Sequence, residues 1–321
     1  MRLWLPQATT SAPEVDWLIL ALVLVSCVIL ALVFGLMLLY LFKYRANSTV
    51  DRGALAKKTW HIEVGWTTAT LVAFFALFVW GADLYVRLFQ PPPGTLKIYV
   101  IGKQWMWKVQ HPGGQREINA LHLPVGRPIE LIMTSEDVIH DFSIPAFRIK
   151  HDVLPGRYEM LWFQAERPGT YHLFCTQLCG TGHPEMTGEI VAMPTPDFQK
   201  WLEQNGTGET LAAAGRTLFM RYGCSGCHGG TGAGGNEAKS TVRSPSLVGL
   251  YGSPVTLADG RVVIADDRYI RDCIMLPDTL RVASYPPVMP SFAGQMSEED
   301  LLKIIAYIKS LAPETPSENP S

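Results

Sequence analysis

The chain has 321 residues, of which 48% are hydrophobic, and it carries a formal net charge of −2. This length is enough for two or three domains, and the near-neutral charge gives no basis for a nucleic-acid partner, so none is expected. The hydrophobic residues are unevenly distributed along the chain, which predicts that its successive segments differ in structural class.

Two apolar runs near the N-terminus predict a hairpin of transmembrane helices. Neither Trp17 to Phe42 nor Val64 to Ala82 contains a charged residue, and at about 1.5 Å per residue the first run is long enough to cross a bilayer. The loop from Lys43 to Lys58 carries one acidic residue, Asp51, and five basic ones, which are Lys43, Arg45, Arg52, Lys57 and Lys58. The positive-inside rule therefore predicts a cytoplasmic loop, with the N-terminus and everything after about residue 88 on the outer face.

The alternative for the first run is a removable signal peptide, because Leu24 to Cys27 resembles a lipoprotein cleavage site. The apolar stretch continues to Phe42, well beyond Cys27, and this exceeds the usual signal core of about 7–15 residues. A retained helix is therefore favoured.

Residues of about 95–193 consist of short apolar stretches divided by Gly and Pro, a pattern typical of an all-β domain. The predicted strands are Leu96 to Ile101, Ile129 to Met133, Arg157 to Phe163, Gly169 to Phe174 and Gly188 to Val191. Strands of this length and spacing predict an antiparallel sandwich or barrel.

A soft ligand set lies near the end of this β region. Cys175, Cys179, His183 and Met186 supply two thiols, an imidazole and a thioether within 12 residues, and sulfur with imidazole selects copper over harder cations. A disulfide between the two cysteines is one alternative, but it leaves the His and the Met unused. A zinc site is another, although Met is a poor zinc ligand.

A second imidazole ligand is expected from His140, which lies between apolar strands ahead of the cysteine loop. The other histidines of the β region are expected to be surface or structural residues, and these are His111, His122, His151 and His172.

The segment Cys224-Ser225-Gly226-Cys227-His228 is a C-x-x-C-H motif, in which two thioether bonds hold a haem and the His ligates its iron. A chance C-x-x-C, a disulfide and half of a zinc site are the alternatives. No second ligand pair follows at zinc spacing, so the haem interpretation is favoured.

The sixth ligand of such a haem is expected to be a Met, which raises the haem potential relative to a second His. Met289 is preferred over Met275 and Met296, because it lies in a proline-stiffened loop while the other two look like core or helix-start residues. Helices are predicted at Leu211 to Arg221, with Thr210 as the N-cap, and at Ser297 to Leu311. A helix, a haem motif, a Met loop and a helix form a cytochrome c arrangement.

These residues together resemble one known family. The spacing His140, then Cys175-x-x-x-Cys179-x-x-x-His183-x-x-Met186, is similar to the copper motif of subunit II of cytochrome c oxidase. The later C-x-x-C-H and Met-Pro signals resemble the cytochrome c domain fused to some bacterial members. The resemblance covers essentially the whole chain, and it implies a membrane α-helical hairpin, then an all-β cupredoxin-like domain, then a C-terminal all-α cytochrome c domain.

The resemblance also implies the cofactors and their ligands. A dinuclear copper centre, CuA, would be bridged by Cys175 and Cys179, with one imidazole per copper and two weaker donors completing the ligand set. The imidazoles would come from His140 and His183, and the weaker donors would be Met186 and the backbone carbonyl of Gln177. One covalent haem c would be attached to Cys224 and Cys227, with His228 and Met289 as the axial iron ligands.

Three further positions gain a role only through the resemblance. Trp105, in the aromatic segment from Gly102 to Trp107, would be the point where electrons enter above CuA, and Glu63 would lie near the start of a proton path. An aromatic core or interface role is the alternative for the tryptophans, and an ordinary interfacial carboxylate for Glu63. Many members carry Glu where this chain has Gln177, which weakens the case for a magnesium contact at that position.

The expected domain boundaries follow from these assignments. Residues 1–92 form the N-terminal segment and hairpin, 93–196 the cupredoxin-like CuA domain, 197–209 a linker, 210–312 the cytochrome c domain and 313–321 a disordered tail. The linker segment Asn205 to Gly208 is expected to give the two metal domains some hinge freedom.

The expected function is that of the electron-transfer subunit of a proton-pumping haem-copper cytochrome c oxidase in a bacterial inner membrane, with both metal domains on the periplasmic face. Electrons from a soluble cytochrome c or another small donor would pass to the haem, then to CuA, then to subunit I, which reduces dioxygen to water. Subunit III is a further expected partner. The alternatives are a nitric oxide reductase with a CuA subunit and a membrane-anchored copper carrier.

Overall fold

The computed structural model describes residues 6–50, 59–234 and 244–311. The chain divides into two compact units, Met1–Pro92 with Ala146–Arg148 and Pro93–Pro145 with Ile149–Ser321. The predicted disordered tail at 313–321 lies outside the described residues. So do three of the basic residues of the predicted cytoplasmic loop, Arg52, Lys57 and Lys58.

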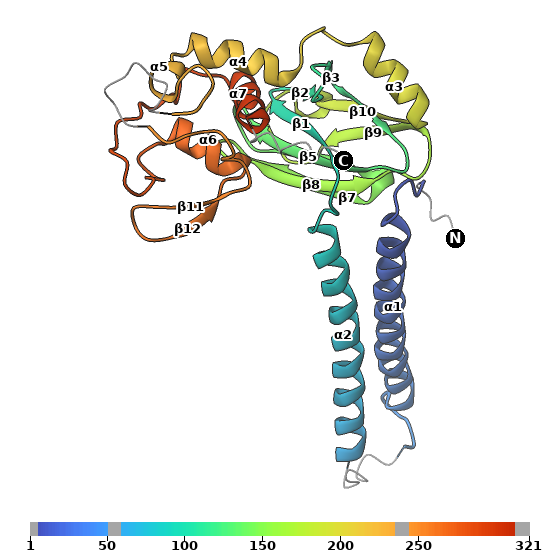
Figure 1. The fold of residues 1–321 in the computed structure, drawn as a ribbon. Helices are drawn as coiled ribbons and strands as arrows, with labels where there is room; N and C mark the ends of the chain where they lie inside the picture. The colour runs from blue at the N-terminus through green and yellow to red at the C-terminus, as the bar shows by residue number, and fades with distance from the viewer. Residues whose placement is uncertain (1–5, 51–58, 235–243, 312–321) are drawn as a thin grey trace, which may run out of the picture. The chain divides into compact units, whose positions relative to one another are not determined.

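Helices α1 (Ala12–Lys43) and α2 (Trp60–Leu88) make up most of the first unit (Figure 1). Both are long and apolar enough to cross a membrane, and the predicted apolar runs lie inside them. Nearly all of their large apolar side chains are exposed in the single chain, as expected of helices that face lipid or partner helices. An ion pair of 2.6 Å joins Glu14 in the first turn of α1 to Arg87 in the last turn of α2, which fits an antiparallel hairpin.

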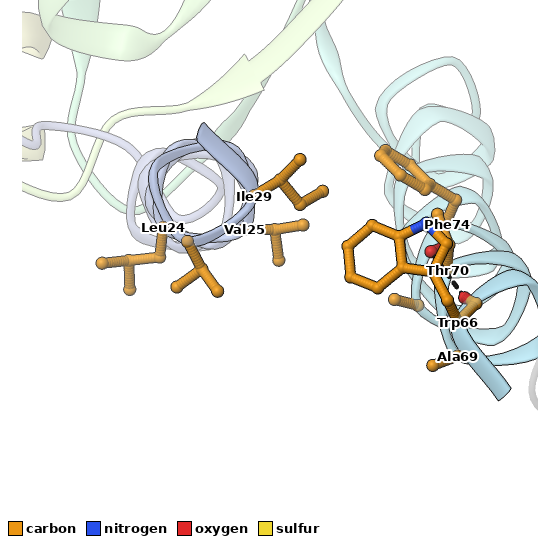
Figure 2. Close-up of a pocket in the computed structure, with 9 residues that line it drawn as sticks. Leu24, Val25, Ile29, Trp66, Ala69, Thr70 and Phe74 are labelled. Carbon is orange, nitrogen blue, oxygen red and sulfur yellow. Dashed lines mark hydrogen bonds between the residues drawn. The ribbon is translucent and has the colours of Figure 1, made fainter. Parts of the chain in front are cut away.

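An apolar groove of about 300 Å³ lies between these two helices (Figure 2). Leu24 and Ile29 line it from α1, and Trp66 and Phe74 line it from α2. The hydroxyl of Thr70 donates to the backbone carbonyl of Trp66 at 2.8 Å, so it is satisfied within its own helix. The groove therefore presents a mainly apolar surface.

The second unit begins with a β-domain of two five-stranded sheets (Figure 1). The sheets have the strand orders β3-β2-β1-β5-β8 and β4-β10-β9-β6-β7. The strand bounds are β1 (Leu96–Lys103), β2 (Met106–Gln110), β3 (Arg116–Ile118), β4 (Ala120–Pro124), β5 (Pro128–Ser135), β6 (His140–Ile144), β7 (Ile149–Val153), β8 (Glu159–Gln164), β9 (Gly169–Cys175) and β10 (Thr187–Met193). Two short 3-10 turns are η1 (Pro145–Phe147) and η2 (His183–Glu185). All five strands predicted from the sequence are present.

The core of this sandwich lies between its two sheets. Trp107 from β2 and Phe142 from β6 are fully buried, and their rings meet edge to face with centroids 5.1 Å apart. Each sheet contains one parallel pair, β1 with β5 and β4 with β10, and the remaining pairs are antiparallel. The prediction of a wholly antiparallel sandwich was therefore wrong in part, because side-chain alternation reports which face a residue occupies and not the direction of its neighbour.

Helix α3 (Thr195–Gln204) occupies most of the segment that was predicted to be a linker. It packs against three polar residues, the buried His111 and Glu117 and the partly exposed His122. Both histidines contact the carboxylate of Glu117, at 2.8 and 2.5 Å. The ring of Trp201 in α3 stacks on His122 with centroids 4.5 Å apart. These two histidines are structural, as predicted, and the irregular part of the linker shrinks to the residues between α3 and the next helix.

The cytochrome-like region contains α4 (Leu211–Arg221), α5 (Ser225–His228), the hairpin β11 (Pro254–Thr256) and β12 (Val262–Ile264), α6 (Asp267–Met275) and α7 (Glu298–Ser310). The Thr210 and Ser297 side chains cap α4 and α7, accepting backbone N–H bonds at 3.2 and 3.1 Å. Both predicted helices are therefore confirmed, one residue short of the prediction at each end of α7. Helices α4 and α7 cross closely at Gly215, where an added Cβ would lie 1.8 Å from the carbonyl oxygen of Lys303.

The β-domain and the cytochrome-like region meet in a buried apolar contact within the second unit. Leu211 of α4 and Leu302 of α7 cluster with Tyr99 and Ile101 of β1 and Ile132 of β5. Polar contacts accompany this cluster, because Lys309 donates to the Tyr99 hydroxyl at 3.0 Å and Arg116 pairs with Glu299 at 3.2 Å. Burial of this kind favours a fixed contact between the two regions, and the hinge freedom expected of the linker stays a prediction.

Candidate metal centres

The predicted copper ligands come from two strands of the second sheet, β6 and β9, and from the segment that joins β9 to β10. His140 is the first residue of β6, Cys175 is the last residue of β9, and these strands pair with Phe142 opposite Cys175. The loop after β9 then carries Cys179 and returns to β10 through η2. His140, Cys175 and Cys179 are all buried, and one ligand atom from each lies within 4.8 Å of the others.

The remaining predicted donors surround the same point. The sulfurs of Cys175 and Cys179 are 3.8 Å apart, far beyond the 2.05 Å of a disulfide, and both thiols are free. The Cys179 sulfur lies 3.5 Å from Nδ1 of His183 and 3.7 Å from the sulfur of Met186. The backbone carbonyl of Gln177 faces the Cys175 sulfur at 3.2 Å. The fold thus gathers the whole predicted ligand set.

The chemistry of this cluster suits a soft cation. Within the described part of the chain, Nδ1 of His140 is buried without a hydrogen-bond partner, while its Nε2 is bonded to Asp137 at 2.8 Å. A bound metal satisfies such a nitrogen. Burial is the largest single influence and would raise the pKa of the Cys175 thiol, but the His140 imidazole, the backbone at Asp141 and Gln177 and the Cys179 side chain together outweigh it and lower this pKa to about 6. The thiolate, which is the metal-binding form, is therefore favoured.

Trp105 lies on the outside of the cysteine loop. Its indole is 39% exposed, and its Nε1 donates to the carbonyl of Cys179 at 3.2 Å. The side chain of Gln104 donates to the same carbonyl at 2.8 Å. The backbone of Gly182 packs against the indole, since an added Cβ there would lie 2.5 Å from the ring. Trp107, by contrast, is a fully buried core residue, which was its alternative assignment.

The haem motif forms α5, and its histidine is held in a defined orientation. The Nδ1 of His228 contacts the carbonyl oxygen of Pro245 at 3.0 Å, which leaves Nε2 available to a metal. Burial lowers the pKa of His228, and so favours the neutral imidazole that binds iron. Cys224 and Cys227 are both free thiols in the same turn. The residues present therefore fit a covalently held haem.

The three candidate methionines differ in their surroundings. Met275 and Met296 are buried in the core of the cytochrome-like region, as predicted, together with Leu301 and Ile305. Met289 is 36% exposed and lies outside that core, in the loop between α6 and α7. The side chains of Met275 and Met296 are therefore used in core packing, and of the three Met289 is the one available to a haem.

Glu63 lies in the first turn of α2 and accepts a hydrogen bond of 2.5 Å from the hydroxyl of Thr59. This contact supports the start of the helix, which is the ordinary role of an acidic residue at a helix N-terminus. A role in proton uptake remains a prediction.

Asp137 was missed by the sequence-based reasoning. It contacts both His140 and the backbone of Gln104, which is 33 positions away in the chain. The only local signal is its place three residues before His140, in a turn.

Comparisons with known proteins agree with the two metal-binding regions. The family model for the periplasmic domain of cytochrome c oxidase subunit II matches residues 115–193, and the cytochrome c model matches residues 212–312. Cytochrome c oxidase subunit 2 of Alkalihalophilus pseudofirmus is 27% identical over 320 residues, covering 93% of this chain and 88% of that protein. The alternative cytochrome c oxidase subunit 2 of Bradyrhizobium diazoefficiens is 27% identical over 197 residues, covering 52% and 70%.

Among solved structures, the periplasmic domain of cytochrome oxidase subunit II from Bradyrhizobium japonicum is 32% identical, covers 36% of this chain and 96% of that one, and has a TM-score of 0.35. The two family matches occur in the order predicted from the motifs, and one relative extends over nearly the whole of both proteins. The chain belongs to the family of cytochrome c oxidase subunit II, and it carries a cytochrome c domain at its C-terminal end.

Proposed function

We propose that this chain is the electron-transfer subunit of a proton-pumping haem-copper oxidase in a bacterial inner membrane. It accepts electrons from a soluble cytochrome c or another small donor at a covalent haem c, and it relays them through a dinuclear CuA centre to subunit I, where dioxygen is reduced to water. Subunit III is a further partner. The observation that carries the proposal is the buried cluster of His140, Cys175 and Cys179, in which Nδ1 of His140 has no partner among the described residues.

In the copper site, Cys175 and Cys179 would hold the metal through their thiolates, and His140 and His183 would supply the imidazole ligands. Met186 and the carbonyl of Gln177 supply the remaining donors, and both lie within 4 Å of a cysteine sulfur. When bound, such a centre supplies one-electron redox chemistry shared over two metals. The protein holds these donors in place between packed strands, which excludes water and limits their movement when the charge changes.

In the haem site, Cys224 and Cys227 would hold the group and His228 would supply a ligand to its iron. The carbonyl of Pro245 accepts the Nδ1 proton of His228, so the imidazole keeps one tautomer with Nε2 directed at the iron. Met289 would supply the second protein ligand, because Met275 and Met296 are buried in the core. Reversible one-electron reduction is the chemistry this group supplies.

Trp105 is the point where electrons enter the copper site. The exposed indole is bonded directly to the Cys179 carbonyl, so one hydrogen bond separates the protein surface from a copper ligand. Trp107 is too deeply buried to serve this purpose. Trp105→Phe should therefore slow electron transfer from the donor to copper and leave the copper spectrum unchanged.

The orientation in the membrane follows from the charges at the end of α1. Lys43 is in the last turn of α1 and Arg45 follows, so this end of the hairpin faces the cytoplasm and both metal domains face the periplasm. Glu63, near the cytoplasmic start of α2, serves at the start of a proton path into subunit I. Glu63→Gln should slow proton uptake by the assembled oxidase without changing either metal spectrum.

The proposal is tested by low-temperature electron paramagnetic resonance of the oxidised full chain in detergent, loaded with copper and haem. A multi-line hyperfine pattern from one electron shared by two coppers is expected. Cys179→Ser should replace this pattern with the four-line signal of a single copper. Cys273→Ser is the matched control, because Cys273 lies in the cytochrome domain away from the cluster and should leave the pattern unchanged.

A four-line signal from the unmodified chain would refute the relay and point to a mononuclear copper carrier. The absence of any copper signal, with the two cysteines oxidised, would point to a disulfide and refute the copper site altogether.

A further inference from the structure

Asp137 connects a predicted copper ligand to the segment where electrons enter. One carboxylate oxygen, Oδ1, accepts from Nε2 of His140 at 2.8 Å and from the backbone N–H of Val138 at 2.7 Å. The other, Oδ2, accepts from the backbone N–H of Gln104 at 2.7 Å. The Ser135 hydroxyl lies 3.4 Å from Oδ1 and accepts the backbone N–H of Asp137 at 3.2 Å.

The segment at Gln104 reaches the cysteine loop as well. The side chains of Gln104 and Trp105 both donate to the carbonyl of Cys179, at 2.8 and 3.2 Å. Two residues before Gln104, in β1, an added Cβ at Gly102 would lie 2.8 Å from the ring of His140. The tip of the β1–β2 hairpin therefore contacts both chain segments that carry copper ligands, and Asp137 supplies the bond on the His140 side.

We infer that Asp137 is a positioning residue for the copper centre, whose carboxylate fixes the tautomer of His140 with Nδ1 directed at the metal and ties that imidazole to the Gln104–Trp105 segment. The inference rests on the proposed function, since it concerns the same site. A carboxylate that accepts the N–H of a metal-bound imidazole makes the imidazole a stronger donor. Stronger donation stabilises the oxidised metal and lowers the reduction potential.

The turn alone does not require this arrangement. An Asp or Asn at this position can cap the turn by accepting from the backbone N–H of Val138, and one oxygen is enough for that bond. The second oxygen accepts from Gln104 in the β1–β2 turn, and the first also accepts a hydrogen bond from Nε2 of His140. In Asp137→Asn only one acceptor oxygen remains, and it carries no charge. Because Val138 and His140 share Oδ1, an amide oxygen at that position keeps both bonds as a weaker acceptor while Gln104 loses its acceptor. With the amide reversed, Gln104 keeps its acceptor while Val138 and His140 both lose theirs, so the charged acceptor of His140 is lost in either case.

Glu136→Gln is the matched control. Glu136 is adjacent to Asp137 in the chain, and its side chain is similarly shielded, at 16% exposure against 24%. It pairs with Lys103 and Lys108 at 3.1 and 3.0 Å. This substitution removes the same charge from the same turn and leaves the bond to His140 intact, so it separates a general charge effect from the hydrogen bond.

The experiment compares the two variants with the unmodified full chain in detergent, loaded with haem and titrated with copper. Asp137→Asn should bind copper about 10–100-fold more weakly. It should also have a higher copper reduction potential and faster exchange of the His140 Nε2 proton, measured by paramagnetic nuclear magnetic resonance of the copper-loaded protein. Its haem absorbance should be unchanged, and Glu136→Gln should match the unmodified chain in every measurement.

The potential and the proton exchange would not move if Asp137 only supported the turn. Asp137→Asn with an unchanged copper affinity, potential and exchange rate would overturn the inference while the two-copper signal of the unmodified chain upheld the proposed function. An unmodified chain without that signal would overturn both. If Asp137→Asn took up no copper, Asp137→Glu would be tested next. Copper binding by Asp137→Glu, which restores a carboxylate, would support the inference. Failure of Asp137→Glu to bind copper would overturn it, provided that the copper-free variant unfolds like the unmodified chain.

Discussion

The close crossing of α4 and α7 at Gly215 determines whether a larger residue at this position stabilises or destabilises the protein. An added Cβ at Gly215 would lie 1.8 Å from the carbonyl oxygen of Lys303 and 2.9 Å from Cβ of Tyr307. To reach an ordinary separation of about 3.5 Å, the two helices would have to move apart by about 1.7 Å. We therefore expect Gly215→Ala to destabilise the cytochrome domain.

The magnitude follows from two opposing effects. Ala is more favourable than Gly inside a helix by about 1 kcal/mol, so the substitution would stabilise an open site. Overpacking costs about 1–3 kcal/mol where side chains can shift. Here the obstacle is the backbone of α7, which also carries Leu301, Ile304 and Ile305 into the core, so the cost should be at the top of that range or above it. The net loss should be about 2 kcal/mol or more.

The assay is urea unfolding of the full chain in detergent, followed by the haem absorbance, which reports on the cytochrome domain. Arg216 is the neighbouring exposed residue of α4, so the pair Arg216→Ala and Arg216→Gly calibrates the effect of helix propensity alone. That pair should differ by about 1 kcal/mol in favour of Ala. A Gly215→Ala variant as stable as the unmodified chain, or more stable, would refute the close crossing of the two helices.

Three other predictions concern separate features. Met289→Ala should remove the proposed thioether ligand and lower the haem reduction potential, whereas Met296→Ala should cost about 2–5 kcal/mol of stability and leave haem ligation unchanged. Magnetic circular dichroism reports the ligation and urea unfolding reports the stability. The reverse pattern would reject Met289 as the ligand. Thr210→Ala and Ser297→Ala should each destabilise the cytochrome domain by about 0.5–2 kcal/mol, while equal stability would deny the caps. Burial would raise the pKa of Glu117, but hydrogen bonds from His111 and His122 outweigh it and the pKa is about 2. Because this pKa lies below the ordinary 4.5, Glu117 should contribute about 3 kcal/mol above pH 4.5, and that contribution should be lost as the pH falls towards 2. Glu117→Gln should flatten this acid limb in unfolding curves followed by tryptophan fluorescence, and an unaltered limb would contradict the assignment.

The helices and longer strands were predictable because local signals mark them. Helix α4 begins and ends where predicted, since Thr210 is a strong N-cap. Strand β6 was not predicted, because His140, Asp141 and Ser143 are polar and yet all are buried. Helix α3 was taken for a linker because it has one proline, Pro196, and mostly polar residues. Its stability comes from Trp201 packing on a histidine that is distant in sequence, which no local pattern reveals.

The same distinction holds for the metal sites. Spacing located the cysteine loop and the haem motif, because their ligands lie close together in the chain and their chemistry restricts the residue types. His140 required the resemblance to a family as well as its place in the pattern. Asp137 and Gln104 had no such signal, since Gln104 reaches Cys179 across 75 positions of the sequence. Contacts that depend on the folded sandwich cannot be found from spacing alone.

The pairing of β6 with β9 implies that copper binding also stabilises the fold. Cys175 is opposite Phe142 in this ladder, and His140 is two residues from Phe142 on the same strand. The donor atoms proposed to bind copper therefore come from residues 35 positions apart, with β7 and β8 in the chain between them. A metal bound at both ends acts as a clip on that segment, as a crosslink would, and restricts the unfolded chain. A subunit that loses its copper would then lose conformational stability as well as the ability to transfer electrons. The copper-free protein would therefore also unfold and be degraded more easily.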